Sequence, residues 1–358
     1  MPPCSEAPML TDDLNFSGGD IVLAVRDSKY RVHKAVLGSR SAILAELSLS
    51  APQQTYGGDK LPTVQIYEDH AHFALLLHAL YDHDIEKYLV EHRRIIGELA
   101  FGVMGLAEKY NVSKAKEIQA KFLPLIKSDW PSTLTGWDSL ERQISLKAAE
   151  LDNIDALHTL DKIYPEPACV IQFTHSRGFS LGSPAPSIPD YLPAAFYHLA
   201  RLPPHADPDD ISLQIEDLAE GLRTARKKLL SNRDMICLLH GLHHIRAVAG
   251  RIACVDFPKR ARGFSGATEE EKAVMLNWWH TVGAEKLVGP QQRDLVGGLK
   301  FLIDALGEGG ADSDACSAVL RKGIALPYRK AMRDFLNKER EEFWSSLKEY
   351  FALYAFFS

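Results

Sequence analysis

Residues 18–44 decide the fold and read GGDIVLAVRDSKYRVHKAVLGSRSAIL. Residues 21–25 form an apolar run, residues 26–29 are polar, and residues 30–33 alternate apolar with polar side chains. This pattern is typical of two strands in a hairpin that leads into a helix. The beginning of the chain is therefore predicted to mix strands with helices.

The residues that follow predict another strand and two more helices. Residues 62–67 alternate as a half-buried strand does. Asp69 is placed to cap the next helix, and that helix has one apolar face made of Phe73, Leu76, Leu77, Leu80 and Tyr81. A later helix has a similar face, made of Ile95, Ile96, Leu99, Val103, Leu106 and Tyr110.

Residues 18–127 resemble a BTB/POZ domain. The family's opening pattern sets an aspartate and a leucine, an aromatic residue, a His-Lys pair, a leucine and an Arg-Ser pair at fixed spacing. The residues in these places are Asp20, Leu23, Tyr30, His33, Lys34, Leu37, Arg40 and Ser41. Two later family patterns are matched by segments that contain Tyr81, Lys109 and Tyr110. The resemblance implies a small sheet flanked by helices, in an α+β domain that binds proteins and catalyses nothing.

The resemblance also suggests which residues serve a site. Asp20 and Lys34 correspond to a charged pair that lines a pocket at the dimer groove of transcription-factor BTB domains, although such charges also occur in structural ion-pair networks. His33 is interpreted as a structural residue that fixes the hairpin to the next helix, since it has no partners for metal binding or catalysis nearby. The remaining matched residues are interpreted as structural.

The chain beyond residue 128 has the periodicity of helices. Residues 128–358 predict an all-helical region, interrupted at residues 178–208, which are rich in Pro, Gly and Ser. Residues 1–17 are expected to be a flexible tail. The predicted helical segments are residues 140–160, 211–230, 234–253, 269–282, 293–306 and 328–354.

Two motifs in the helical region resemble those of an expanded group of fungal BTB proteins. Residues 192–202, LPAAFYHLARL, carry a Leu-Pro-Ala-Ala-hydrophobic-Tyr-x-Leu element and form an ordered insert in the break. An Arg-x-x-x-Trp-x-x-Leu-x-x-x-Phe pattern is matched by Arg340, Trp344, Leu347 and Phe351. The last helix is expected to bury the face from Phe343 to Tyr354 and to turn Arg340 and Glu341 towards solvent.

The composition is that of a globular protein. The 358 residues, 46% hydrophobic and 25% charged, suffice for about two domains. A net charge of −6 gives no general reason to expect a nucleic-acid partner. Five scattered cysteines without a C-x-x-C pair indicate neither a disulfide framework nor a zinc knuckle. No secretory signal or membrane span is recognised, so we expect an intracellular protein, in cytoplasm or nucleus, without cofactor or metal.

Three further patterns favour different functions. Residues 178–182 read G-x-S-x-G, as in a hydrolase, with residues 170–173 as a candidate strand, but prolines follow where a helix is needed. A candidate metal cluster, without a complete ligand set, consists of Cys237, His240, His243 and His244. Residues 223–262 hold ten Lys or Arg and two Asp, a basic segment that lacks the interleaved aromatic residues used for base stacking.

We therefore expect a protein-binding adaptor or scaffold that self-associates as a homodimer and is not an enzyme. A substrate adaptor of a cullin-type ubiquitin ligase is the first alternative. The family's hydrophobic-x-Glu motif for cullin recruitment is missing from residues 47–61, and Leu44-Ala45-Glu46 has the letters but lies in the preceding helix. A transcription-linked regulator that uses the basic segment is the second alternative, and a serine hydrolase is a remote third.

Overall fold

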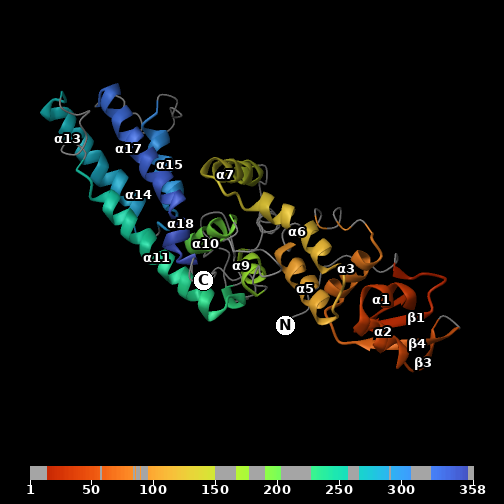
Figure 1. The fold of residues 1–358 in the computed structure, drawn as a ribbon. Coiled ribbons are helices and arrows are strands. Elements are labelled where there is room, and N and C mark those ends of the chain that lie inside the picture. Colours follow the sequence, from red (N-terminus) through yellow and green to blue (C-terminus); the bar gives the residue numbers. More distant parts are fainter. Residues whose placement is uncertain are drawn as a thin grey trace. The chain divides into compact units, whose positions relative to one another are not determined.

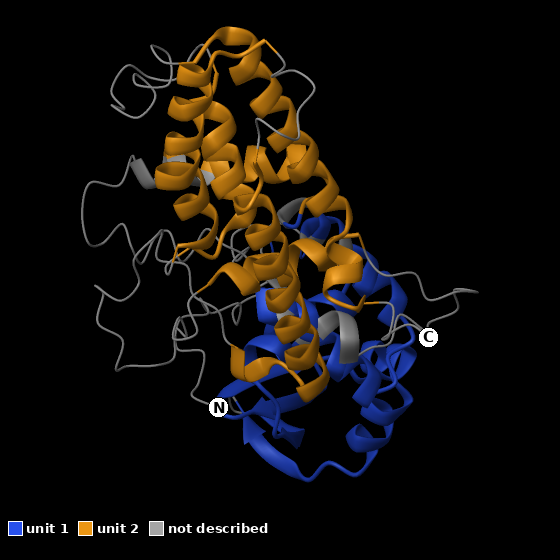
Figure 2. Ribbon diagram, turned by 90° about the vertical axis from the view of Figure 1, so that its left-hand side faces the viewer, with its two compact units in different colours: residues 1–130, 147–177 blue, residues 131–146, 178–358 orange. Residues whose placement is uncertain are grey.

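The fold is shown in Figure 1 as a computed structural model that describes residues 14–56, 59–83, 85, 89, 96–149, 167–176, 190–202, 227–256, 266–289, 292–307 and 324–353. The chain divides into two compact units, coloured in Figure 2. Unit 1 comprises residues 1–130 and 147–177, and unit 2 comprises residues 131–146 and 178–358. The segment that resembles a BTB domain lies within unit 1.

Unit 1 contains a four-stranded mixed sheet in the order β2-β1-β4-β3. Its strands are β1 (Ile21–Val25), β2 (Ser28–Val32), β3 (Gln53–Tyr56) and β4 (Asp59–Ile66). β1 pairs antiparallel with β2 and parallel with β4, whereas β3 pairs antiparallel with β4. All five side chains of β1 are buried, as expected for a central strand covered on both faces.

The hairpin is tighter than the sequence predicted. Only Arg26 and Asp27 form the turn, with Arg26 in the left-handed region at φ 51°, and Ser28 already belongs to β2. β2 is an edge strand, and such a strand pairs through its backbone while its side chains can face solvent. The polar residues Ser28 and Lys29 therefore belong to the strand, although their polarity assigned them to the turn. β4 begins at Asp59 rather than residue 62. β3 was missed because Gln-Gln-Thr-Tyr lacks the apolar alternation that marks a strand.

Helices flank the sheet within unit 1. They are α1 (Lys34–Arg40), α2 (Ala42–Leu49), α3 (His70–Leu80), α5 (Ile96–Lys109), α6 (Ala115–Asp129) and α9 (Pro167–Ser176). Asp69 caps α3 as predicted, because its Oδ1 accepts hydrogen bonds from the backbone N–H groups of Ala71, at 3.0 Å, and His72, at 3.2 Å. Most of the two predicted apolar faces is confirmed by the burial of Phe73, Leu76, Leu77, Leu80, Leu99, Val103, Leu106 and Tyr110. Tyr81 is only half-buried, and Ile95 and the side chain of Ile96 lie outside what the structure describes.

The candidate strand before the G-x-S-x-G pattern is a helix. Residues 170–173 lie in α9, which packs against α5 and buries Ala168, Val170 and Ile171. A short apolar run fits a buried strand and a buried helix equally well, and here the packing against α5 decides. The strand expected of a hydrolase is therefore absent at residues 170–173, while residues 178–182 lie outside the described residues.

Unit 2 is helical throughout its described residues. Its α-helices are α7 (Leu134–Ala149, of which residues 134–146 belong to this unit), α10 (Leu192–Arg201), α11 (Asn232–Ala253), α13 (Glu269–Trp278), α14 (Ala284–Val288), α15 (Leu295–Ala305), α17 (Leu326–Ser345) and α18 (Leu347–Tyr350). A 3-10 turn (η4, Lys227–Leu229) precedes α11, and a π-helical turn (η6, Trp279–Gly283) joins α13 to α14. The insert at residues 192–202 is helix α10. Residues 150–160, 203–226 and most of the 178–208 break lie outside the described residues.

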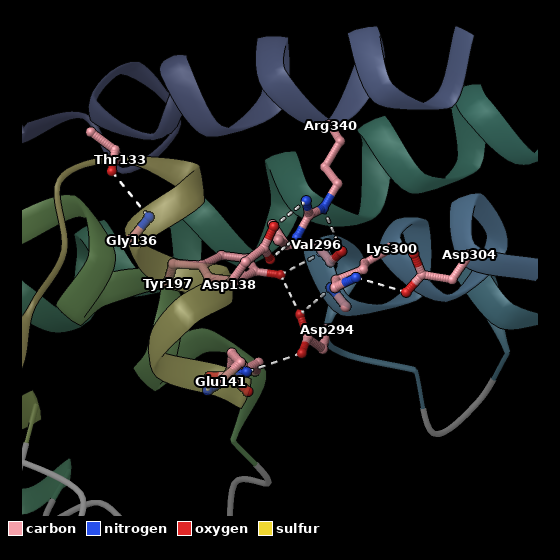
Figure 3. Close-up of polar contacts among 12 residues, drawn as sticks. Thr133, Gly136, Asp138, Glu141, Tyr197, Asp294, Val296, Lys300, Asp304 and Arg340 are labelled. Carbon is pink, nitrogen blue, oxygen red and sulfur yellow. Dashed lines mark hydrogen bonds and ion pairs between the residues drawn. The ribbon is translucent and has the colours of Figure 1, made fainter. Parts of the chain in front are cut away.

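Arg340 joins three helices of unit 2 (Figure 3). On α17, its guanidinium binds both carboxylate oxygens of Asp138 on α7, and its Nε donates a hydrogen bond at 3.0 Å to the backbone oxygen of Val296 on α15. The prediction that Arg340 faces solvent was wrong. Its partner Asp138 lies 202 positions away in the chain, so helical periodicity alone cannot reveal that the charge is buried and paired.

Arg201 forms a second buried network of ion pairs and hydrogen bonds. On α10, it binds Glu141 at 2.6 Å and Asp294 at 3.0 Å, and its Nη2 donates to Nδ1 of His198 at 2.9 Å. Asp294 also accepts from the Tyr197 hydroxyl at 2.7 Å and from the backbone N–H of Gly297. Burial alone would raise the pKa of Asp294, but the charge of Arg201 and these hydrogen bonds outweigh burial and lower it.

Three aromatic residues near the C-terminal end are core residues, as predicted, whereas Tyr350 of the same predicted face is only half-buried. Phe343, Trp344 and Phe351 are buried, and the Trp344 indole N–H donates to the backbone oxygen of Ser132 at 3.2 Å. A Cβ on Gly241 would lie 1.9 Å from Cε1 of Phe351, so only glycine fits there.

The prediction of one continuous last helix was wrong. α17 ends at Ser345 and a separate helix, α18, follows it. Ala352, just beyond α18, is left-handed at φ 51°. Tyr354 lies outside the described residues.

Replacing Trp344 with Ala should lower the free energy of unfolding of unit 2 by about 3–5 kcal/mol, because the change removes a buried ring and leaves a cavity. Urea unfolding of the full chain followed by circular dichroism measures the effect. Ile236→Ala on α11 is the matched control, since Ile236 is exposed and its truncation should cost little. A loss below about 1 kcal/mol for Trp344→Ala contradicts its place in the core.

Asp294→Asn should destabilise the protein at pH 7 by roughly 1.5–3 kcal/mol, the usual contribution of hydrogen bonds to a charged group. Because the folded pKa of Asp294 is lowered, its stabilising contribution is complete above the unfolded pKa of about 3.9 and is lost as the pH falls through the folded pKa. The difference between wild type and Asp294→Asn should therefore shrink below pH 4 in urea titrations. Asp304→Asn, which breaks an exposed pair with Lys300, is the control and should change little at any pH. A difference that persists undiminished at pH 3 contradicts this account.

Candidate interaction surface

α1 is fixed at its beginning by an aromatic cluster. His33, the residue before α1, donates its backbone N–H to the Tyr81 hydroxyl at 2.7 Å, and its Nδ1 lies 3.1 Å from the same oxygen. The Tyr81 ring stacks on Phe16, with centroids 4.5 Å apart and planes 16° apart. His33 thus ties the end of β2 and the start of α1 to the end of α3.

Asp20 contributes to the same end of α1. Its Oδ1 accepts a hydrogen bond at 2.7 Å from the backbone N–H of Lys34, the first residue of the helix. A carboxylate there satisfies an N–H group that has no partner within the helix and suits the positive end of the helix dipole. In the part of the chain that the structure describes, no ion pair joins the side chains of Asp20 and Lys34.

The junction between α1 and α2 is held by Arg40 and Ser41. Ser41 donates its hydroxyl to the backbone oxygen of Tyr110 and accepts from the backbone N–H of Leu44, which caps α2. Arg40 forms an ion pair at 3.2 Å with Asp82, which also binds Lys114. The hydrogen bond from Lys114, together with the charges of Lys114 and Arg40, lowers the pKa of Asp82.

The remaining matched residues lie in the core or beside it. Leu23, Tyr30 and Leu37 are buried, and burial raises the pKa of Tyr30 to about 12. The Tyr110 hydroxyl donates to Glu68 at 3.0 Å, and Glu68 also pairs with Lys109. The matched residues therefore come together as the framework that holds α1, α2, α3 and α5.

This framework leaves one face of the α1–α2 pair exposed to solvent. We define the α1–α2 surface by the exposed residues Ala35, Gly38, Ser39, Ala42, Ile43, Glu46 and Leu49. Their spacing places them on one side of each helix, and the two helices pack against each other. Ile43 is 37% exposed and Leu49 is 86% exposed. Glu46 carries the only charge among the seven residues.

Sequence reasoning missed Ile43 and Leu49 as candidates. Both lie beyond or at the end of the matched pattern, and an apolar residue in a helix is usually assigned to the core. Only the burial pattern of α2 in the structure reveals their exposure. Leu44 and Ser48 are buried four positions apart, so Ile43 and Leu49 fall outside the buried stripe.

The letters Leu44-Ala45-Glu46 do not form an exposed hydrophobic-x-Glu motif. Leu44 is buried in α2, whereas Glu46 is exposed. A partner could contact Glu46 without reaching Leu44. The stretch in which the family motif was expected includes the exposed strand β3.

In the candidate metal cluster Cys237 is buried, whereas His240 and His243 are exposed and His244 is half-buried. His244 stacks on Tyr350 with centroids 5.3 Å apart, and Nδ1 of His240 donates to the Tyr350 backbone oxygen at 2.7 Å. Burial, followed by the charges of the neighbouring histidines His240 and His243, lowers the pKa of His244. Within the described residues, no group of three His, Cys, Asp or Glu side chains could hold a metal ion.

The basic segment is only partly described. Arg251 pairs with Glu339 through both terminal nitrogens of its guanidinium group, at 3.1 and 2.5 Å. The charge of Arg251 is therefore paired within unit 2. Residues 223, 226 and 257–262 lie outside the described residues. None of the helices in the described ranges is both long enough and apolar enough to cross a membrane.

Comparison with known proteins identifies one part of the chain. Residues 15–126 match the family model of the BTB/POZ domain. No curated protein and no solved structure was found to match. The match covers the sheet and helices from β1 to α5 and most of α6. Residues 15–126 of this chain are a BTB/POZ domain, which is a protein–protein interaction module.

Proposed function

We propose that this protein is a self-associating adaptor or scaffold, and that its BTB/POZ domain forms a homodimer through the α1–α2 surface. The observation that carries the proposal is an exposed helical face with two large apolar side chains and a single charge. The centres of protein interfaces are depleted of charged residues, and clustered apolar exposure marks contact sites.

The geometry of the face suits a two-fold contact. A dimer with two-fold symmetry uses the same patch on both partners, so the patch must be compatible with itself. Ala35, Gly38 and Ala42 have small side chains or none, which lets two helical faces approach closely. Glu46 is the one group that would meet a like charge, and it can stay at the solvated rim.

In this proposal Asp20 and Lys34 support α1 instead of lining a charged pocket. The Asp20 carboxylate already binds the backbone N–H of Lys34, at the start of α1. A side chain used in this way holds the helix, and with it the α1–α2 surface, in place. An adaptor must bind two different partners, and unit 2 is a second compact unit with its own surface for the other partner.

We also propose that the protein belongs to the fungal group of BTB proteins, which two motifs of unit 2 resemble. Their residues contact one another across the unit, since Phe196 packs against Phe351 with centroids 5.4 Å apart and Tyr197 against Trp344 at 6.1 Å. Recruitment of a cullin is the alternative function, and co-purification of a cullin with the tagged protein tests it.

Sedimentation velocity over a concentration series tests self-association. The wild-type protein should form dimers by high micromolar concentration, and the double variant Ile43→Glu, Leu49→Glu should weaken dimerisation at least about tenfold, because it introduces like charges into an apolar contact. The matched control is Tyr67→Glu, since Tyr67 is 87% exposed in the same unit but lies outside the α1–α2 surface.

The result depends on the contrast between these variants. Unchanged far-ultraviolet circular dichroism shows that each variant is folded. A wild-type protein that stays monomeric at high micromolar concentration contradicts the proposal. So does a Tyr67→Glu variant that weakens dimerisation as much as the double variant does.

A further inference from the structure

Unit 2 contains a cavity of about 370 Å³ where α14 ends and α15 begins, beside α11. This volume lies within the range of sites that hold small molecules. The buried side chains of Ile245 and Ala249 from α11, Leu287 from α14 and Leu295 from α15 give it an apolar floor. The exposed Val288 continues the apolar surface to the rim.

Two arginines line the same cavity. Arg246 projects from α11 and is exposed, and in the described part of the chain it forms no ion pair. Arg293 is half-buried and donates one hydrogen bond, at 3.3 Å, to the backbone oxygen of Leu202. That bond uses one nitrogen of the Arg293 guanidinium and leaves its charge without a carboxylate partner among the described residues.

The acidic residues next to the cavity in sequence do not neutralise these charges. Asp294 lies between two lining residues, but its carboxylate binds Arg201, Tyr197 and the N–H of Gly297. Glu285 on α14 is exposed and is not a lining residue. Among the described residues, the lining therefore combines two positive charges, the side-chain amide of Gln292 and an apolar floor, with no acidic side chain.

We propose that this cavity binds a small organic anion, with a carboxylate or phosphate head group between Arg246 and Arg293 and a short apolar body against Ile245, Ala249 and Leu287. The planar guanidinium fork matches the oxygens of both head groups. The apolar floor favours an anion with an apolar body over a bare inorganic ion, because an inorganic ion leaves the floor uncovered. The site is separate from the α1–α2 surface and does not depend on self-association.

Isothermal titration calorimetry of the full-length protein tests the site with four probes: octanoate, octyl phosphate, octanol and inorganic phosphate. Octanoate or octyl phosphate should bind at least about tenfold more tightly than octanol, which lacks the charge, and than inorganic phosphate, which lacks the apolar body. The two anionic probes also distinguish a carboxylate from a phosphate head group.

Variants identify the groups responsible. Arg246→Gln and Arg293→Gln should each weaken binding of the preferred anion about tenfold and leave octanol unaffected. Arg142→Gln on α7 is the matched control, because Arg142 is an exposed arginine of unit 2 that does not line the cavity, and its effect should stay within about twofold. Failure of both anions to bind overturns the proposal. Octanol or inorganic phosphate binding as tightly as the anions overturns it too, as do arginine variants that behave like the control.

Discussion

The parallel pairing of β1 with β4 is the constraint on which the BTB/POZ domain depends. Parallel neighbours cannot be joined by a tight hairpin, so the chain must leave the sheet after β2 and return before β4. α1 and α2 form that connection, and the chain re-enters the sheet as β3, which precedes β4 and pairs with it. Ser41, Arg40 and His33 then fix the two helices to α3 and α5. None of these framework contacts uses the side chains of the α1–α2 surface, which stay exposed to solvent.

Unit 2 uses charge in two different ways. Arg201 and Arg340 are buried and each has carboxylate partners on other helices, which compensates the cost of removing the charge from water. Such pairs fix which helices become neighbours, since a mispaired arrangement would leave a buried charge alone. Arg246 and Arg293 have no such partner among the described residues and line a cavity. The first two arginines hold helices of unit 2 together, whereas we propose that the second two bind an anionic ligand.

The sequence predicted the parts of the fold that repeat along the chain. A continuous apolar run located β1, period-2 alternation located β2 and β4, and period-3.6 faces located α3, α5, α11 and α15. It failed where a partner far away in the chain decides the structure. Arg340 looks like a surface residue until Asp138 is placed beside it, and residues 170–173 suit a strand until α5 is placed against them. The α1–α2 surface was missed for the opposite reason, because Ile43 and Leu49 have the chemistry of core residues and only the packing shows that they are exposed.

We propose that the BTB/POZ domain binds a second copy of itself through the outer face of α1 and α2. Amide hydrogen exchange of the full chain, compared at low and high micromolar protein concentration, tests this claim most directly because it maps the contact without altering any residue. We predict that exchange slows with concentration in residues 34–50 and is unchanged in α13 and α15. Protection that rises with concentration elsewhere in the chain, with residues 34–50 unchanged, would contradict the claim.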